Sequence, residues 1–176
     1  RNRVVTHLQA TGMSRLSELT AKGITAATVS RLEREGVLVR LARGLYQRAD
    51  ASLDVNHTLA EASKLVPKGV ICLTSSLAFH SLTDQIPPKV WMAIGSKDWR
   101  PTFEYPPVRF ARFSGPRLLL GVESHVIDGV SVPIFGVAKT IADLFRYRRT
   151  VGVNVALEGL REALRQKKAS PAEIAR

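Results

Sequence analysis

The chain of 176 residues is long enough for one medium domain or for two smaller ones. Its hydrophobic fraction of 45% and charged fraction of 23% are typical of a globular protein with a core. No apolar run reaches the roughly eighteen residues that a membrane span needs. The single cysteine, Cys72, excludes a disulfide framework and a thiolate zinc site, so we expect a cytoplasmic protein.

Positive charge is the most informative bulk property of the chain. Lysine and arginine number 26 against 15 acidic residues, which gives a formal net charge of +11. A protein this basic is predisposed to bind polyanions, because each phosphate that it neutralises releases condensed counterions. The charge is densest at the start, where residues 1–48 carry nine basic and three acidic side chains, a net of +6. Charge alone does not distinguish DNA, RNA and an anionic membrane.

Short helical patterns open the chain. The spacing of Val4 and Leu8 predicts a first helix that ends at Gly12. Ser14 is a candidate N-cap of a second helix, which Gly23 ends. A third helix, capped by Thr25, is expected to run to Glu35. Two helices joined across a tight glycine turn predict a helix-turn-helix, with a plain helical hairpin as the alternative.

The outward face of the third helix favours DNA binding over a plain hairpin. Small and hydroxyl-bearing residues at its start permit a close approach to a DNA groove, and arginines further along can reach bases or phosphates. The candidate contacts on this recognition helix are Thr25, Ala26, Thr28, Ser30, Arg31 and Arg34.

A basic hairpin is predicted directly after this helix. Residues 37–41 form one strand and residues 45–47 the returning strand, with Arg43 in the turn between them. Such a hairpin is the wing of a winged helix-turn-helix. Arg40 and Arg43, together with Arg48, could reach the DNA backbone or the minor groove.

Residues 49–176 alternate helices and strands and predict a mixed α/β domain. Val122 to Ile127 and Val130 to Phe135 are expected to form a hairpin across Asp128-Gly129. The expected helices cover residues 55–65, 76–82, 137–147 and 154–166 and a last segment from Ser170; the other strands cover residues 70–73, 89–94 and 108–113. The predicted fold class is therefore α+β, with a winged helix-turn-helix at residues 1–48 followed by a mixed α/β C-terminal domain at residues 49–176.

Enzymatic chemistry has little support in this second part. Ser75 and His80 share a short helix, but no elbow motif or orienting acid accompanies them, so a capping serine and a packed histidine are the simpler interpretation. Glu123 and Asp128 could belong to a degenerate nuclease core, but they form no acidic cluster. We expect no catalytic residue, no metal and no cofactor. A DNA-processing enzyme remains a rival hypothesis.

Basic residues collect near the C-terminal end. They form either a solvated face or a surface for an acidic protein partner or a second DNA contact. The candidates for this partner surface are Arg146, Arg148, Arg149, Arg161 and Arg165.

Three motifs resemble the AbiEi-type antitoxins, the DNA-binding partners in type IV toxin–antitoxin systems. Residues 40–46, RLARGLY, are similar to the family's R-x-x-R-G-x-Y wing. Leu73, Ser75, Ala78 and His80 match its L-x-S-x-x-A-x-H run. The segment at residues 138–143, AKTIAD, resembles its A-K-T-[IV]-x-D helix, in which Lys139, Thr140 and Asp143 carry over as positions without a catalytic role. Because Lys139 and Asp143 are four residues apart, an ion pair on the helix surface or a helix cap is a sufficient explanation of this pair.

The resemblance implies a transcriptional autorepressor and antitoxin. Its winged N-terminal domain would bind double-stranded DNA at operator inverted repeats in its own promoter, and its C-terminal domain would counteract a cognate nucleotidyltransferase toxin. The alternative is a ligand-responsive winged-helix regulator without a toxin partner, which a deep apolar pocket would favour.

Overall fold

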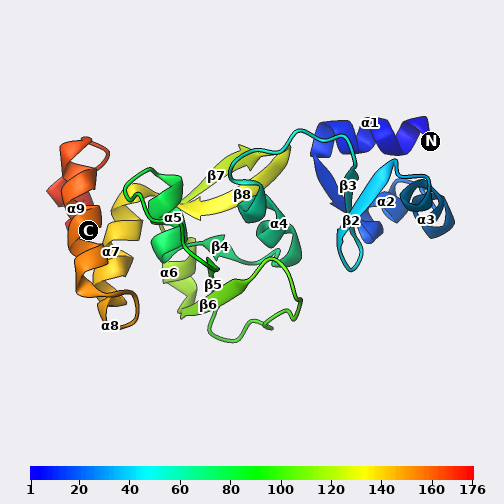
Figure 1. Cartoon of the computed structure of the whole chain (residues 1–176). Coiled ribbons are helices and arrows are strands. Elements are labelled where there is room, and N and C mark those ends of the chain that lie inside the picture. The colour runs from blue at the N-terminus through cyan, green and yellow to red at the C-terminus, as the bar shows by residue number, and fades with distance from the viewer.

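A computed structural model describes all 176 residues, which form an α+β fold with two sheets (Figure 1). The first sheet belongs to residues 1–48, here called the N-terminal unit. Its three strands are antiparallel, in the order β1-β3-β2. In chain order the elements of this unit are α1 (Asn2–Thr11), β1 (Met13–Arg15), α2 (Leu16–Ala21), α3 (Ala26–Arg34), β2 (Leu38–Ala42) and β3 (Leu45–Arg48).

Local signals set the helix ends of the N-terminal unit. α1 ends at Gly12 as predicted, where a φ of 72° is a left-handed value that glycine adopts without a steric penalty. Thr25 caps α3 as predicted, because its side-chain oxygen accepts a hydrogen bond from the backbone N–H of Thr28 at 3.2 Å. The helices close over a core of Val4, Leu8, Leu19, Ile24, Val29, Leu32, Leu38 and Tyr46.

The expected role of Ser14 as an N-cap is wrong. Ser14 lies in the middle of β1, where it pairs with Tyr46 of β3, and α2 begins two residues later. Its hydroxyl is buried and lies 3.0 Å from His7 Nε2 and 3.1 Å from Thr11 Oγ1. These two partners on α1 satisfy the hydroxyl, so it is not available to cap a helix.

Residues 49–176 form the second unit, built around a five-stranded mixed sheet in the order β6-β5-β4-β8-β7. β4 pairs antiparallel with β5 and parallel with β8, and β6 runs parallel to β5 at one edge. The strands are β4 (Val70–Ile71), β5 (Val90–Gly95), β6 (Val108–Phe113), β7 (Val122–Ile127) and β8 (Val130–Phe135). The helices are α4 (His57–Leu65), α5 (Leu73–Phe79), α6 (Gly115–Leu119), α7 (Val137–Arg146), α8 (Arg148–Val151), α9 (Val153–Arg165) and α10 (Pro171–Ala175).

Helices cover both faces of this sheet. Along β5, Trp91 and Ala93 belong to a core shared with α5, α7 and α9, whereas Met92 and Ile94 belong to a second core shared with α4. Adjacent strand residues point to opposite faces, so both faces of β5 are apolar. Figure 1 shows α4 between this sheet and the N-terminal unit, with α7 and α9 at the far end of the molecule.

The predicted hairpin of β7 and β8 is confirmed, and the start of α5 needs correction. Asp128 and Gly129 have φ of 48° and 77°, as a two-residue turn of this type requires.

α5 begins at Leu73 rather than at Ser76. Neither Thr74 nor Ser75 caps it: the hydroxyl of Ser75 accepts a hydrogen bond from the backbone N–H of Trp91 at 2.8 Å. The short helices α6 and α8 were not predicted.

The spacing of apolar residues in α9 indicates an inward face of Val155, Leu157, Leu160 and Leu164, and the structure confirms it only for Val155 and Leu160, which pack against the core. The buried residues are small, namely Ala156, Gly159 and Ala163, whereas Leu157 and Leu164 are 37% and 39% exposed. A Cβ atom on Gly159 would lie 2.9 Å from a methyl of Leu77. The part of α9 nearest the core therefore carries small residues, because Gly159 lies against Leu77 of α5 and Ile141 of α7.

One of the hydrophobic clusters contains residues of both units. Met13 of β1 and Leu45 of β3 are completely buried in the cluster that contains Ile127 and Val130 of the second unit. The backbones meet at a second point, where a Cβ atom on Gly12 would lie 1.4 Å from the carbonyl oxygen of Asp128. The N-terminal unit is therefore packed against the second unit rather than joined to it only by a linker.

This contact gives a stability prediction with a matched control. Gly12 and Gly23 have similar φ values of 72° and 76°, but nothing lies within 4 Å of a Cβ atom on Gly23. Gly23→Ala incurs only the left-handed strain of about 1–2 kcal/mol. Gly12→Ala adds an overlap with Asp128, so its free energy of unfolding in urea falls by a further 1–3 kcal/mol or so. Equal losses in the two variants would show that the units are not packed in this way.

Candidate DNA interface

The outer face of α3 is exposed along its whole length. Val29 and Leu32 are completely buried and fix the rotation of the helix. The predicted site residues Thr25, Ala26, Ser30, Arg31 and Arg34 consequently lie on the solvent side, and all five are exposed. The structure therefore gathers them on one surface, which ends the molecule on the side away from α9 (Figure 1).

Thr28 has a structural task within this surface. It is half-buried, and its Oγ1 lies 2.9 Å from Oγ1 of Thr25. Its backbone N–H donates to the same Thr25 oxygen. The two threonines form the N-terminal cap of α3, and this cap fixes the end of the helix that is expected to enter a groove.

The arginines of α3 are held only weakly. Nε of Arg31 lies 3.7 Å from a carboxylate oxygen of Glu35, with more than half of the Arg31 side chain exposed. Nε of Arg34 donates to the carbonyl oxygen of Ser30 at 3.4 Å. Exposed pairs of this kind contribute about 0–1 kcal/mol, so both guanidinium groups can exchange these partners for a phosphate or a base at little cost.

The β2–β3 hairpin places two more predicted residues at the surface. Arg43 is exposed and forms the turn with Gly44, which has a φ of 74°. Arg40 is also exposed and donates from Nε to the carbonyl oxygen of Ala42 at 3.4 Å. The pairing of β2 with β3 shifts register between Arg40 and Ala42, which marks a bulge next to the turn. Buried Leu45 anchors the returning strand.

Arg48 has a different role from the other arginines. It is half-buried, and its Nε and Nη2 donate to the two carboxylate oxygens of Asp50 at 2.9 and 2.6 Å. Hydrogen bonding from Arg48 lowers the pKa of Asp50. The expected contact of Arg48 with DNA therefore competes with a bidentate ion pair, and Arg48 is a weaker candidate than Arg40 or Arg43.

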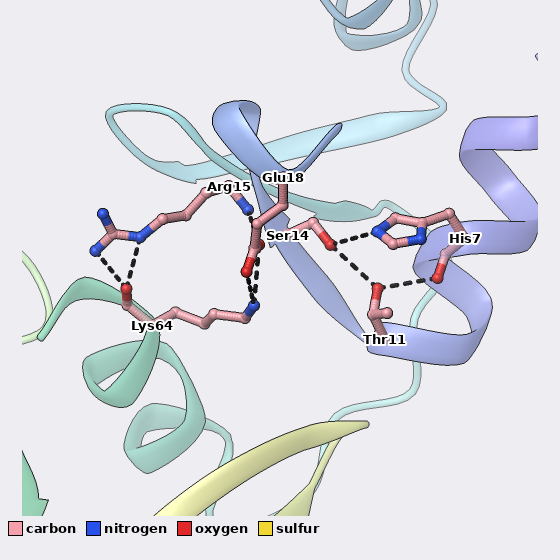
Figure 2. Close-up of polar contacts among 6 residues, drawn as sticks. All are labelled: His7, Thr11, Ser14, Arg15, Glu18 and Lys64. Carbon is pink, nitrogen blue, oxygen red and sulfur yellow. Dashed lines mark hydrogen bonds and ion pairs between the residues drawn. The ribbon is translucent and has the colours of Figure 1, made fainter. Parts of the chain in front are cut away.

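A polar clamp joins α2 to α4 across the boundary between the units (Figure 2). Nε of Arg15 donates to the carbonyl oxygen of Lys64 at 2.8 Å, and Nη2 of Arg15 contacts the same oxygen. The ammonium group of Lys64 donates to both carboxylate oxygens of Glu18, at 2.8 and 3.0 Å. Burial raises the pKa of Glu18, but the hydrogen bonds from Lys64 and from the backbone N–H of Arg15 outweigh it and lower this pKa. The clamp fixes α2, and with it α3, relative to the second unit.

The segment between the units is held by Asp128. One of its carboxylate oxygens accepts a hydrogen bond from the backbone N–H of Asp54 at 2.9 Å, and the other lies 2.7 Å from Nδ1 of His57. Glu61 is buried 3.8 Å from the same imidazole, and burial raises its pKa, although the charge on His57 opposes that shift. Sequence reasoning missed both this cluster and the clamp, because the contacts of Asp128 and of Lys64 that define them span 46 to 74 residues and carry no local signal.

The residues considered for an enzymatic site make other contacts in the structure. Ser75 bonds the backbone of Trp91, while Nε2 of His80 lies 2.8 Å from the carbonyl oxygen of Phe135, so the two do not form a nucleophile–base pair. Glu123 is 3.1 Å from His125, and Asp128 holds the interunit segment. No three His, Cys, Asp or Glu residues are placed to hold a metal ion.

The predicted ion pair of α7 is present and nearly buried. Nζ of Lys139 lies 2.9 Å from a carboxylate oxygen of Asp143, with 16% and 4% of the two side chains exposed. The same ammonium group lies 4.9 Å from the ring centres of Phe113 and Phe135. Burial raises the pKa of Asp143, and the hydrogen bond from Lys139 opposes that rise. This pair belongs to the core rather than to a surface site.

The basic residues predicted as a partner surface lie on or beside α7, α8 and α9. Some of them form hydrogen bonds or ion pairs, and others do not. Arg165 forms an ion pair with Glu162 at 2.7 Å, and hydrogen bonds from Arg165 and Gln166 lower the pKa of Glu162 to about 2. Arg148 donates to the carbonyl oxygen of Phe145 at 2.7 Å. The remaining members, which are exposed and have no hydrogen bond or ion pair, are Arg146, Arg149 and Arg161.

Comparison with known proteins supports the predicted resemblance in one segment. Residues 13–49, from β1 through β3, match the model of a family described as a transcriptional regulator, AbiEi antitoxin. No curated protein matches the chain. None of the helices is long and apolar enough to cross a membrane. The segment that carries α3, the hairpin and the arginine of the clamp is therefore similar to the AbiEi antitoxin transcriptional regulators.

Proposed function

We propose that the chain is a DNA-binding autorepressor and antitoxin of a type IV toxin–antitoxin system. In this proposal residues 1–48 form a winged helix-turn-helix and residues 49–176 the antitoxin domain. The observation that carries it is the exposed basic face of α3, followed in the chain by the exposed Arg40 and Arg43 of the β2–β3 hairpin, within the segment similar to AbiEi antitoxin transcriptional regulators. An α-helix with its side chains is about 10–12 Å across, which fits the major groove of B-DNA, about 12 Å wide.

The chemistry of the face divides the contacts with DNA. At the start of α3, Ala26 and the small side chain of Ser30 allow the backbone to approach the base edges. Arg31 and Arg34, further along the helix, read guanine or hold phosphates. Arg40 and Arg43 of the hairpin reach the backbone or the minor groove beside the helix. The target is an inverted repeat in the chain's own promoter.

The antitoxin half of the proposal places a partner surface at the opposite end of the molecule. The free cations Arg146, Arg149 and Arg161 lie on or next to α7, α8 and α9. They are suited to an acidic surface on the cognate nucleotidyltransferase, or to a nucleic acid that the toxin also binds. Because this surface is far from α3 along the molecule (Figure 1), DNA binding and toxin neutralisation use separate residues.

The ligand-responsive regulator finds less support. One cavity at the boundary between the units, of about 490 Å³, is lined by the clamp residues Arg15, Glu18 and Lys64, by several hydroxyl groups, and by the apolar side chains of Pro67, Val130 and Pro133. Binding sites for small organic ligands are predominantly apolar. The polar clamp already occupies the charged groups of this cavity, so we favour the antitoxin.

DNA binding by α3 is tested with two substitutions. Arg31→Ala and Arg34→Ala are expected to weaken binding to the promoter duplex by about 1–3 kcal/mol each where the arginine reads a base edge. Fluorescence anisotropy with a labelled duplex at a fixed salt concentration measures the loss. Lys89→Ala, which removes one exposed charge outside both proposed surfaces, serves as the control and retains affinity. Wild-type affinity in both α3 variants would rule out α3 as the recognition helix.

Toxin neutralisation is tested by growth. Cells express the open reading frame next to the gene for this chain, together with the wild-type chain or one of two matched double variants. Arg31→Ala/Arg34→Ala is expected to restore growth as the wild type does, and Arg146→Ala/Arg149→Ala to restore it poorly. Both variants lose two positive charges, so each is the control for the other. A harmless neighbour, or a wild-type chain that fails to restore growth, would refute the antitoxin assignment.

A further inference from the structure

β7 forms one edge of the five-stranded sheet and pairs with β8 alone (Figure 1). Ile127 and Val130 flank the two-residue turn, so they form a hydrogen-bonded pair, and every second pair along an antiparallel hairpin is of this kind. The backbone N–H and C=O groups of Val122, Ser124 and Val126 therefore point away from β8. None of these groups has a hydrogen-bond partner elsewhere in the chain. A row of unpaired backbone groups is a template for another strand.

The features that normally block pairing at a sheet edge are absent from β7. Edge strands of soluble proteins commonly carry lysine, proline or a β-bulge. β7 contains no proline or lysine, and it pairs with β8 without a register shift. No lysine or arginine lies between Arg117 and Lys139, in a chain that has 26 of them. The strand itself therefore adds no repulsion between cations to a contact between two copies of this basic protein.

The sequence of β7 is complementary to itself. Residues 122–126 read Val-Glu-Ser-His-Val, and two such strands can pair antiparallel about a two-fold axis at Ser124. In that register Val122 of one copy lies opposite Val126 of the other, so the residues with free backbone groups face one another, as an antiparallel ladder requires. Glu123 likewise lies opposite His125. These two side chains are already 3.1 Å apart within one strand, so pairing places acid and imidazole groups in alternation. A second copy always supplies the matching order of residues, whereas a strand of an unrelated protein would match it only by coincidence.

Exposed apolar side chains lie at both ends of β7. Leu119 and Leu120, directly before the strand, are 77% and 63% exposed. At the other end, the turn after β7 binds the backbone N–H of Asp54, and the residues on either side of Asp54, Leu53 and Val55, are 53% and 94% exposed. In an antiparallel pair the start of one strand lies beside the end of the other. Pairing of two copies would therefore bring the leucines before one strand to Leu53 and Val55 of the other copy and remove apolar surface from water.

We propose that β7 pairs with β7 of a second copy of this chain. The two five-stranded sheets then form one continuous sheet across a two-fold axis at Ser124. The interface is isologous, because the same residues face each other from both copies. The proposal does not rest on DNA binding by α3, although a dimer of this kind has the two-fold symmetry of an inverted repeat.

The mass of the full chain in solution tests the pairing. Sedimentation velocity is expected to show a concentration-dependent change from 19.3 kDa to twice that mass. Ser124→Pro removes the N–H that points to the second copy and leaves the ladder to β8 intact, so it is expected to raise the dimer dissociation constant at least about tenfold. Ser124→Ala is the matched control. It loses the same 2.6 Å contact with the hydroxyl of Ser131 but keeps its N–H, and it is expected to dimerise as the wild type does.

Cysteine cross-linking tests the register. In a hydrogen-bonded pair the Cα atoms are about 5.5 Å apart, which suits a disulfide, so Ser124→Cys is expected to cross-link two copies in the presence of oxidised glutathione. Val126→Cys is the matched control, at a position that is 76% exposed. In the proposed register the two copies of residue 126 lie about 14 Å apart, too far for a disulfide. The native Cys72 is completely buried and does not compete.

Three results would overturn the proposal. They are a wild type that stays monomeric at its highest soluble concentration, a folded Ser124→Pro variant that dimerises as the wild type does, and cross-linking of Val126→Cys as fast as that of Ser124→Cys. A monomeric chain whose β7 pairs with a strand of another protein overturns the choice of a second copy. Arg31→Ala/Arg34→Ala is expected to dimerise as the wild type does, so a failure of the proposed DNA binding leaves this result unchanged. Circular dichroism confirms that each variant is folded.

Discussion

The packing of β1 and β3 against the second unit is the constraint on which the rest of the structure depends. Met13 and Leu45 belong at once to the small sheet of the N-terminal unit and to the core beneath α4. The Arg15–Lys64–Glu18 clamp adds hydrogen bonds at the rim of this contact. Contacts with the second unit therefore hold the N-terminal unit, and with it the exposed face of α3, in a fixed position. Removing residues 1–48 would expose the apolar side chains that Met13 and Leu45 cover, so point substitutions separate the two functions more cleanly than truncation does.

The same architecture gives each proposed task its own part of the molecule. α3, the proposed recognition helix, lies at one end, and the basic residues around α7 to α9 lie at the other (Figure 1). The charged groups between the units are already paired: Glu18 with Lys64, and Asp128 with His57. Several exposed cations, among them Arg43, Arg146, Arg149 and Arg161, have no ion pair, and this agrees with the formal charge of +11 and the preference for polyanions that it implies.

The parts of the structure that were predicted from the sequence are those that local chemistry decides. The Thr25 cap, the left-handed Gly12 and the Asp128-Gly129 turn each depend on a few neighbouring residues, and the exposed face of α3 follows from the burial of Val29 and Leu32. The errors arose where distant segments decide. Ser14 resembles a helix cap, but β3, more than thirty residues later, draws it into a strand. The inner face of α9 is set by its close approach to Leu77, which no periodicity within α9 reveals.

The central claim is that α3 and the β2–β3 turn together form the DNA face, supported by a rigidly docked unit. Amide hydrogen exchange of the full chain, with and without its promoter duplex, tests this most directly. The account predicts that the duplex slows exchange in Ala26–Arg34 and at residues 40–44, while the amides of β5 and β8 remain as protected as they are in the free protein. Protection confined to the second unit, with α3 unchanged by the duplex, would contradict it.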